Sequence, residues 1–161
     1  MSDPMHDVDL RSASLMDADD VAVLLSALGY PCEREDASDR IHAIIANDRQ
    51  ALVLARHDGA VCGLIALDFM YYLPLGTTTC RITAMVVTPE AQGRGLGEAL
   101  IRRLLDDRTE KQVLLSTPEI NGEANRAWRL YRRLGFTDVI RGYHFAGDPR
   151  PFAILGRSLP L

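Results

Sequence analysis

The sequence predicts a mixed α/β fold: a central sheet, mostly antiparallel, that is flanked by helices and splays apart at one parallel pair of strands. Apolar and β-branched runs in the middle of the chain predict a meander of three strands. A glycine-rich turn at 93–97 joins the last of these strands to a helix, and another strand follows. Strand, helix and strand in succession imply a parallel pair with a right-handed crossover. The predicted order is β-α-α-β-β-β-α-β-α-β-β, in a single domain over residues 1–161.

The first half opens with one strand and two helices. Apolar and polar residues alternate over 7–14, which predicts a short strand. Leucines and valines at helical spacing over 21–28 predict a helix that ends at Gly29. After a polar loop, Ser38 is expected to cap a shorter second helix that turns three isoleucines inward.

The middle of the chain is predicted to form two hairpins. Asp58 and Gly59 separate two apolar runs, and this dipeptide is typical of a two-residue hairpin turn. A second hairpin is expected to turn near Leu75 and Gly76 and to lead into a strand that ends at Val87. The three strands therefore form an antiparallel meander.

The second half alternates helices with strands. Apolar residues recur at helical spacing over 96–104 and over 127–134, and the second helix is expected to end at Gly135. The predicted strands of this half are 111–118, 136–145 and 152–160.

The charge of the chain is divided unevenly. The net charge is −4, yet residues 1–90 carry −8 and residues 91–161 carry +4. This division favours an anionic ligand held by the second half and a cationic one attracted to the first. Arginines are mixed with acids and there is no basic arm, so nucleic acid is not expected as a partner.

Location and metal content also follow from composition. The N-terminal segment is acidic and polar, and no run of about 18 apolar residues occurs, so we expect a cytoplasmic protein that does not insert in a membrane. Cys32, Cys62 and Cys80 are odd in number and widely spaced. We therefore expect free thiols and no metal site.

The glycine-rich turn predicts a site for an anion. The first N–H groups of a helix have no partner within it, and a turn that directs several of them to one point binds negative charge. Gly93, Gly95 and Gly97 allow close approach of the backbone. The spacing differs from G-x-G-x-x-G, and no P-loop lysine follows, which argues against a dinucleotide or a nucleoside triphosphate.

These residues carry a resemblance to a family. The segment 92–97, Gln-Gly-Arg-Gly-Leu-Gly, resembles the Q/R-x-x-G-x-G/A motif of the GNAT N-acetyltransferase superfamily. A second segment, from Asn125 through Tyr131 to Gly135 and Phe136, is similar to the N-x-x-A…Y-x-x-x-G-F segment of that family. The predicted order of elements also resembles the GNAT fold over nearly the whole chain.

The resemblance implies acetyl-CoA as the acyl-donor cosubstrate. Backbone groups of Met85, Val86 and Val87 are then expected to pair with the pantetheine arm like an added strand. Asn125 is a further candidate contact, with helix capping as the alternative. The residues expected to bind the pyrophosphate are Gln92, Gly93, Arg94, Gly95, Leu96 and Gly97.

The resemblance further implies direct attack of an amine on the thioester. Tyr131 is the candidate general acid toward the leaving sulfur, although a core tyrosine would show the same helical position. Many members carry a glutamate where this chain has Thr83, so Asp68 on the neighbouring strand is the candidate base. A water chain is an alternative route for the proton. The candidate residues for the acceptor pocket are Glu33, Glu35 and Glu119.

The function expected from the sequence is transfer of an acetyl group from acetyl-CoA to a primary amine of a small cationic acceptor. Two alternatives stay open: a protein N-terminal or lysine acetyltransferase, and a non-catalytic acyl-CoA-binding regulatory module. The missing strand acid keeps the second alternative in view. A homodimer is compatible with the sequence but not indicated by it.

Overall fold

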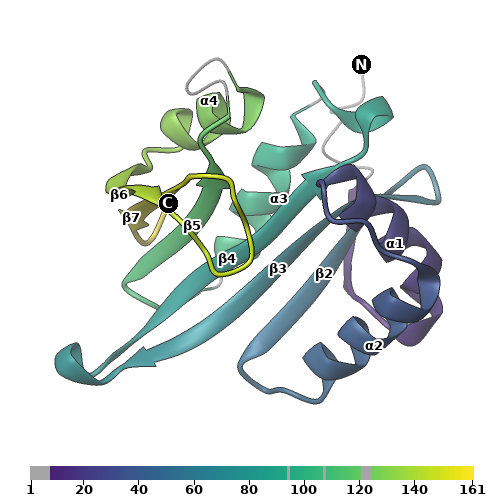
Figure 1. Ribbon diagram of the computed structural model, residues 1–161, viewed down its shortest axis with the longest axis horizontal. Helices are drawn as coiled ribbons and strands as arrows, with labels where there is room; N and C mark the ends of the chain where they lie inside the picture. The colour runs from purple at the N-terminus through teal and green to yellow at the C-terminus, as the bar shows by residue number, and fades with distance from the viewer. Residues whose placement is uncertain (1–7, 94, 107, 121–124) are drawn as a thin grey trace. The chain divides into compact units, whose positions relative to one another are not determined.

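The computed structural model describes residues 8–93, 95–106, 108–120 and 125–161 (Figure 1). The strands and α-helices are β1 (Val8–Ser12), α1 (Ala18–Ala27), α2 (Arg34–Ile45), β2 (Gln50–His57), β3 (Ala60–Tyr72), β4 (Thr77–Val87), α3 (Leu96–Leu105), β5 (Gln112–Pro118), α4 (Arg126–Arg133), β6 (Thr137–Tyr143) and β7 (Phe152–Ser158). Short 3-10 turns lie at Leu15–Asp17, Leu73–Leu75 and Pro89–Ala91. The order of strands and helices is the predicted one.

The strands form one mixed sheet in the order β1-β2-β3-β4-β5-β7-β6. The pairs β1–β2, β2–β3, β5–β7 and β6–β7 are antiparallel, whereas β4 and β5 run parallel. The described parallel ladder joins Cys80–Ile82 to Val113–Leu115 and is much shorter than either strand. The predicted fold class, a mostly antiparallel sheet with one parallel pair, is confirmed.

The chain divides into two compact units. The first contains Met1–Asp68 and Thr83–Ile101, and the second contains Phe69–Ile82 and Arg102–Leu161. Strands β3 and β4 each contribute residues to both units.

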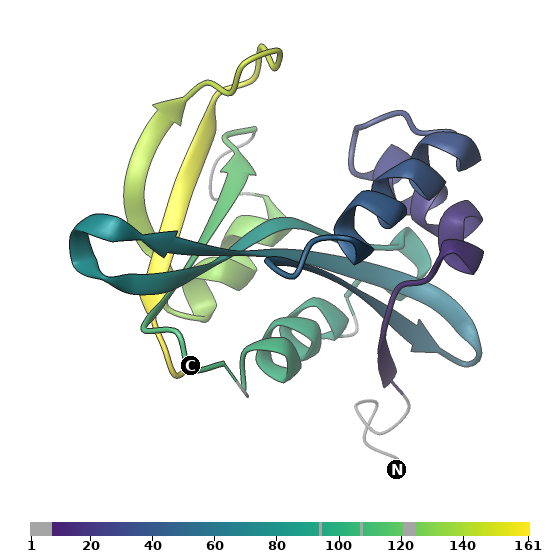
Figure 2. The ribbon, with the colours of Figure 1, turned by 90° about the horizontal axis from the view of Figure 1, so that it is seen from below.

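The first unit has two apolar cores that share strands β2 and β3. Leu54 and Leu64 pack with Leu24 of α1 and with the neighbouring helix α2 in one core. Ala55 and Cys62 pack with the start of α3 in the other, next to the point where the β2–β3 ladder shifts register. Figure 1 shows α1 and α2 side by side, and Figure 2 shows them on one side of strands β2 and β3.

The second helix begins earlier than the sequence predicted. The prediction that Ser38 caps it was wrong, because α2 begins at Arg34 with Glu33 at its cap. The Glu33 N–H donates to the Asp36 carboxylate at 3.1 Å, which satisfies a donor that the helix itself leaves free. Acidic residues in this first turn also suit the positive end of the helix dipole.

The second unit is built on β5, β7, β6 and α4. Trp128, Tyr131 and Leu134 of the α4 region are buried, together with Phe136 and Leu155. The Trp128 ring N–H donates to the Pro118 carbonyl at 3.0 Å, which fixes the helix to the end of β5. Helix α4 begins at Arg126 with Asn125 in an extended conformation at its cap, and residues 121–124 lie outside the described part of the chain.

Two further findings concern the whole of the described chain. Cys32, Cys62 and Cys80 are buried and form no disulfide among the described residues. No α-helix among the described residues is long and apolar enough to cross a membrane.

Candidate functional site

In the first unit, the end of β4 is held firmly where it enters the glycine-rich turn. The Thr88 N–H donates to the Cys62 carbonyl at 2.8 Å, which ties the strand end to β3. The Gln92 side-chain amide donates to the Val87 carbonyl at 3.0 Å. The Gln92 main-chain N–H donates to the Thr88 carbonyl at 3.1 Å. Gln92 therefore folds the turn back onto the strand, and its donors are engaged within the protein.

Two glycines of the turn adopt a backbone conformation that favours glycine. Gly93 and Gly95 have φ angles of +79° and +75°, in the left-handed region that favours glycine. A Cβ on Gly95 would meet no atom within 4 Å, so the approach to this residue is open. Helix α3 begins immediately afterwards, and its first bond joins the Ala99 N–H to the Gly95 carbonyl at 3.0 Å.

The turn presents several main-chain donors at the start of α3. Within the described residues, the N–H groups of Gly93, Gly95, Leu96 and Gly97 donate no hydrogen bond. These donors lie at the start of a helix, where the dipole also favours negative charge. Arg94, which the sequence placed at the same site, lies outside the described residues. The arrangement can bind an anion such as a diphosphate.

A close approach at Gly63 seats α3 against the sheet. A Cβ on Gly63 would lie 3.1 Å from the Val86 carbonyl oxygen and 3.2 Å from Cδ1 of Leu100. Leu100 itself is buried. The absence of a side chain on β3 thus allows α3, and with it the turn, to pack closely on the strands.

Met85, Val86 and Val87 form the last part of β4. They are half-buried and lie beyond Ile82, where the described parallel ladder with β5 ends. The predicted role of these residues, pairing with an amide-bearing arm, is compatible with that position and stays a prediction.

In the second unit, Tyr131 is a buried phenol on α4. Its ring packs edge-to-face with Phe136, with 6.0 Å between the centroids. Burial raises the pKa of Tyr131 to about 12, so the phenol keeps its proton at neutral pH. No hydrogen bond of its hydroxyl occurs among the described residues. The residue can donate a proton or a hydrogen bond.

Asn125 caps helix α4. Its side-chain oxygen accepts from the Ala127 N–H at 2.9 Å, and its side-chain amide donates to the Ile120 carbonyl at 3.5 Å. Capping, the alternative offered by the sequence, is therefore what the side chain does in this structure. Its contact with a cofactor stays a prediction.

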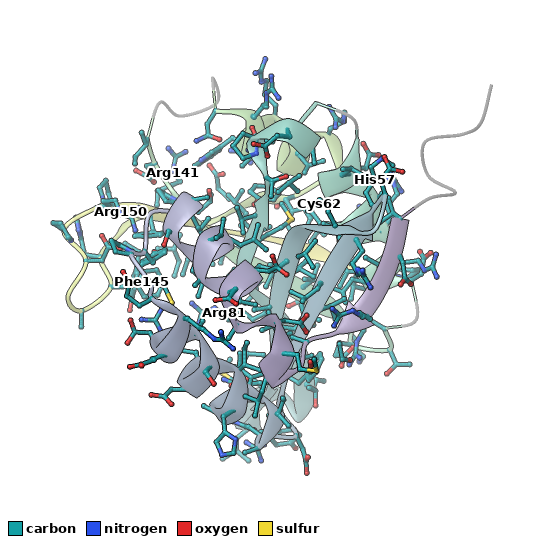
Figure 3. All side chains as sticks on the ribbon, turned by 90° about the vertical axis from the view of Figure 1, so that its right-hand side faces the viewer. His57, Cys62, Arg81, Arg141, Phe145 and Arg150 are labelled. Atoms are coloured by element: carbon teal, nitrogen blue, oxygen red, sulfur yellow. The ribbon has the colours of Figure 1, made fainter. Side chains whose placement is uncertain are left out.

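Glu119 is engaged by an arginine. Its carboxylate accepts from Arg141 Nε at 2.7 Å and from the Gly142 N–H at 3.0 Å. The Arg141 hydrogen bond holds the pKa of Glu119 below its usual range. Arg141, labelled in Figure 3, also pairs with Asp138 at 3.2 Å and lies 5.0 Å from the centroid of the Trp128 ring. Glu119 thus has a structural partner where the sequence suggested an acceptor contact.

The other predicted carboxylates lie in the first unit. Asp68 is half-buried and pairs with Gln50 in the β2–β3 ladder, and its carboxylate makes no hydrogen bond or ion pair among the described residues. Glu33 and Glu35 are exposed at the start of α2. Asp68 is therefore the one of these three whose surroundings set it apart from a solvated surface acid.

Sequence reasoning did not single out Arg81. It is a charged residue between Cys80 and Ile82, both buried, in a strand that is otherwise apolar or hydroxylated. The sequence feature that could have drawn attention to Arg81 is its charge within an otherwise uncharged strand.

The chain belongs to the GNAT family of acetyltransferases, whose family model matches residues 19–136. This match confirms the family that the two sequence motifs suggested. The glycine-rich turn and the segment from Asn125 to Phe136 both lie within it.

Two relatives and one solved structure define the similarity further. A GCN5-like protein acetyltransferase of Mycobacterium tuberculosis is 74% identical over 87 residues, 54% of this chain and 42% of the relative. The [ribosomal protein bS18]-alanine N-acetyltransferase of Escherichia coli is 33% identical over 79 residues, 48% of this chain and 53% of that protein. The chain thus spans about half the length, or less, of these relatives.

The solved structure is the spermidine N-acetyltransferase of Vibrio cholerae in complex with CoA and spermine. Its TM-score is 0.76 at 18% identity, with coverage of 95% of this chain and 96% of that one. At that identity the likeness shows the fold alone.

Proposed function

We propose that this chain is an acetyl-CoA-dependent N-acetyltransferase that acylates a primary amine by direct attack. The observation that carries the proposal is the set of main-chain donors at Gly93, Gly95, Leu96 and Gly97, which have no protein acceptor among the described residues. A diphosphate is the ligand in this reaction that needs several such donors at one point. Membership of the GNAT family supports the same conclusion.

The cofactor would be held entirely by residues of the first unit. The four N–H donors bind the diphosphate, and Gln92 keeps the turn in position through its bond to the Val87 carbonyl. Backbone groups of Met85, Val86 and Val87 pair with the amides of the pantetheine arm, as a ligand strand pairs with a sheet edge. This places the thioester beside the end of β4.

The chemistry requires two proton transfers. An aliphatic amine has a pKa of about 10 and a thiol about 8.5, so the amine must lose a proton before it attacks and the sulfur must be stabilised as it leaves. The new C–N bond forms as the C–S bond breaks. Asp68, half-buried and without a protein partner among the described residues, is the candidate to accept the amine proton, directly or through water.

Tyr131 is the candidate group for the leaving sulfur. Its pKa of about 12 lies above that of the thiol, so complete transfer of the phenol proton to the thiolate is unfavourable. A hydrogen bond from the neutral phenol to the developing thiolate has no such cost. We therefore assign Tyr131 mainly a donor role, in which the proton stays on the phenol oxygen.

The acceptor class that we favour is an amine of a protein. The observation that supports a protein acceptor is the 74% identity over 87 residues to a GCN5-like protein acetyltransferase. A protein acceptor was one of the alternatives that the sequence left open. A small cationic amine is the second candidate, supported by Glu33 and Glu35, which are exposed at the start of α2. Net charge by itself biases association without selecting a molecule.

A thiol-release assay with acetyl-CoA tests the proposal. The panel contains lysine peptides, peptides with a free N-terminus, and spermidine. Turnover with peptides but not with spermidine supports the protein acceptor, and the opposite result supports the small amine. Calorimetric titration with coenzyme A is run in parallel. Tight binding without any turnover would indicate a regulatory module, and no binding would overturn the proposal.

A further inference from the structure

Strand β3 of the first unit carries an irregularity that contacts both sides of the glycine-rich turn. In the β2–β3 ladder Ala55 pairs with Gly63 and Arg56 pairs with Val61, so Cys62 is an extra residue on β3. An extra residue of this kind is a β-bulge, which redirects the main chain locally. Cys62, labelled in Figure 3, and Gly63 are both buried. We call these two residues the β3 bulge.

The β3 bulge holds the end of β4, which leads into the turn. The Cys62 carbonyl accepts from the Thr88 N–H at 2.8 Å. A Cβ on Gly63 would lie 3.1 Å from the Val86 carbonyl oxygen. The Thr88 carbonyl in turn accepts from the Gln92 main-chain N–H at 3.1 Å. All of these contacts on β4 are made by main-chain atoms, so a shift of the β3 bulge moves the strand end and the start of the turn with it.

The β3 bulge also holds the helix that follows the turn. The same Cβ on Gly63 would lie 3.2 Å from Cδ1 of Leu100, a buried side chain of α3. Cys62 packs in one core with Leu100 and with Leu96, the first residue of that helix. The end of β4 and the start of α3 therefore rest on two consecutive residues of β3.

The missing side chain of Gly63 sets how closely the two flanks of the turn approach each other. Two carbon atoms in optimal contact are about 3.5–4.0 Å apart, and the Cβ of an alanine would lie closer than that to Leu100. The methyl group would press on the Val86 carbonyl and on the helix at the same time. Since the core around it is filled, one or both flanks would have to move.

We propose that the β3 bulge is a positioning element for coenzyme A, which fixes the separation between the glycine-rich turn and the end of β4. This inference rests on the proposed acetyltransferase function, in which the diphosphate lies on the turn and the pantetheine arm along the strand end. A ligand that engages both places depends on their separation, because its second contact forms only where the geometry allows it. A ligand that engages one place does not depend on it.

Binding of three ligands to the full chain tests the positioning role. Coenzyme A is compared with ADP, which carries a diphosphate without the arm, and with pantetheine, which is the arm without the diphosphate. Alanine at Gly63 adds one methyl group and meets no left-handed φ there. In Gly63→Ala we expect about tenfold weaker binding of coenzyme A by calorimetry, with ADP and pantetheine within about twofold of wild type by NMR titration. Unchanged affinity for coenzyme A, or an equal loss for all three ligands, overturns the proposal.

Steady-state kinetics gives a second measurement that does not depend on the weak binding of the fragments. We expect the KM for acetyl-CoA to rise about tenfold in Gly63→Ala, with kcat and the KM for the amine nearly unchanged, since the lost interaction is with the cofactor. A rise of both KM values to the same extent would indicate general disruption of the site and would contradict a positioning role.

Gly156→Ala is the matched control. Gly156 is a buried glycine of β7 in the second unit, without a left-handed φ, and a Cβ there would lie 2.7 Å from Cδ2 of Leu114. We expect this alanine to lower the melting temperature at least as much as Gly63→Ala does, while the affinity for coenzyme A stays within about twofold of wild type. Equal weakening of coenzyme A binding by the two alanines would mean that reduced stability alone explains the effect, and the proposal would be wrong.

A double variant covers the case in which Gly63→Ala does not fold. Gly63→Ala with Leu100→Val nearly conserves the volume of the core and relieves the contact with the helix, but it keeps the contact with the Val86 carbonyl. We expect the same pattern of ligand affinities in this variant. A wild-type chain that does not bind coenzyme A would overturn the proposed function itself. Normal binding and turnover in the wild type, with no change in either alanine variant of Gly63, would overturn the positioning role alone.

Discussion

Two regions of this molecule carry family motifs, and they treat their polar groups in different ways. The turn after β4 in the first unit leaves the N–H groups of Gly93, Gly95, Leu96 and Gly97 without a protein acceptor among the described residues. The α4 region of the second unit engages the side chain of Asn125 in a cap. The first region therefore presents N–H groups to solvent or to a ligand, whereas the Asn125 side chain of the second region caps its helix.

The two regions differ in whether their N–H and carboxylate groups have partners among the described residues. Gly93 and Gly95 are exposed, so water can accept from their N–H groups, and a bound anion can replace that water. Glu119 and Asp138 instead share Arg141, and their carboxylates are neutralised within the protein. Tyr131 is the exception in the second unit, because its hydroxyl has no bond among the described residues.

The largest effect is expected for Tyr131→Phe, which removes that hydroxyl. We expect kcat to fall about a hundredfold, as for loss of one acid–base or donor group, with acetyl-CoA affinity and melting temperature nearly unchanged. Steady-state kinetics with calorimetric binding measures both. Tyr71→Phe, on an exposed residue of β3, is the matched control. An unchanged kcat would mean that the Tyr131 hydroxyl has no catalytic role and that the residue serves only to pack the core.

The next largest effect concerns a partly buried ion pair in the first unit. Asp17 is buried, its Oδ1 lies 2.6 Å from Arg11 Nη2, and the hydrogen bond from Arg11 lowers the pKa of Asp17 to about 2. Because the folded pKa lies below the unfolded value, the pair stabilises the fold above about pH 4, and this stability is lost as the pH falls toward 2. The shift corresponds to about 2 kcal/mol.

Urea unfolding of the wild type and of Asp17→Asn between pH 2 and pH 7 checks this expectation. The wild type should lose more stability on acidification than the variant does. Asp138→Asn, at an exposed pair of the second unit, should change the pH dependence much less, because water screens that pair. Equal changes in the pH dependence of stability in the two variants would show that burial of Asp17 does not make its ion pair more stabilising than the pair at Asp138.

The sequence predicted the backbone of both regions better than the partners of their side chains. A left-handed φ at Gly93 and Gly95 follows from local sterics, so a glycine pattern reveals it without knowledge of the fold. The element order follows from hydrophobic periodicity in the same local way. The start of α2 was missed because Asp36 reaches back to the Glu33 N–H, a capping bond that competes with the cap expected at Ser38.

Side-chain partners depend on residues that are distant in the sequence. Glu119 meets Arg141, and Arg81 meets Phe145, across separations that only the tertiary structure sets. Periodicity could not therefore show that Glu119 is engaged by Arg141 or that Arg81 lies beside Phe145. The same limit applies to Asp68, whose isolation from charged neighbours among the described residues appears only in the fold.

A smaller effect is expected for Gly95→Ala, compared with Gly135→Ala as its control. Both residues have positive φ, +75° and +85°, so each alanine should cost about 1–2 kcal/mol of stability. Of the two, Gly95 belongs to the glycine-rich turn, whose N–H groups have no acceptor among the described residues, and its alanine should weaken coenzyme A binding about tenfold. Calorimetric titration measures the binding and urea unfolding the stability. If Gly135→Ala weakens coenzyme A binding as much as Gly95→Ala does, the glycine-rich turn has no special role in holding the cofactor.

The smallest effect is expected for Asn125→Ala, which separates capping from cofactor contact. Loss of the bond to the Ala127 N–H should lower stability by about 1 kcal/mol, and Asn125→Asp should restore most of it because aspartate caps equally well. If capping is the whole role, coenzyme A affinity stays within about twofold of wild type in both variants, since no contact worth a hydrogen bond is lost. A fall in affinity in both, with stability restored in Asn125→Asp, would instead show that the amide touches the cofactor and that the second unit shares in its binding.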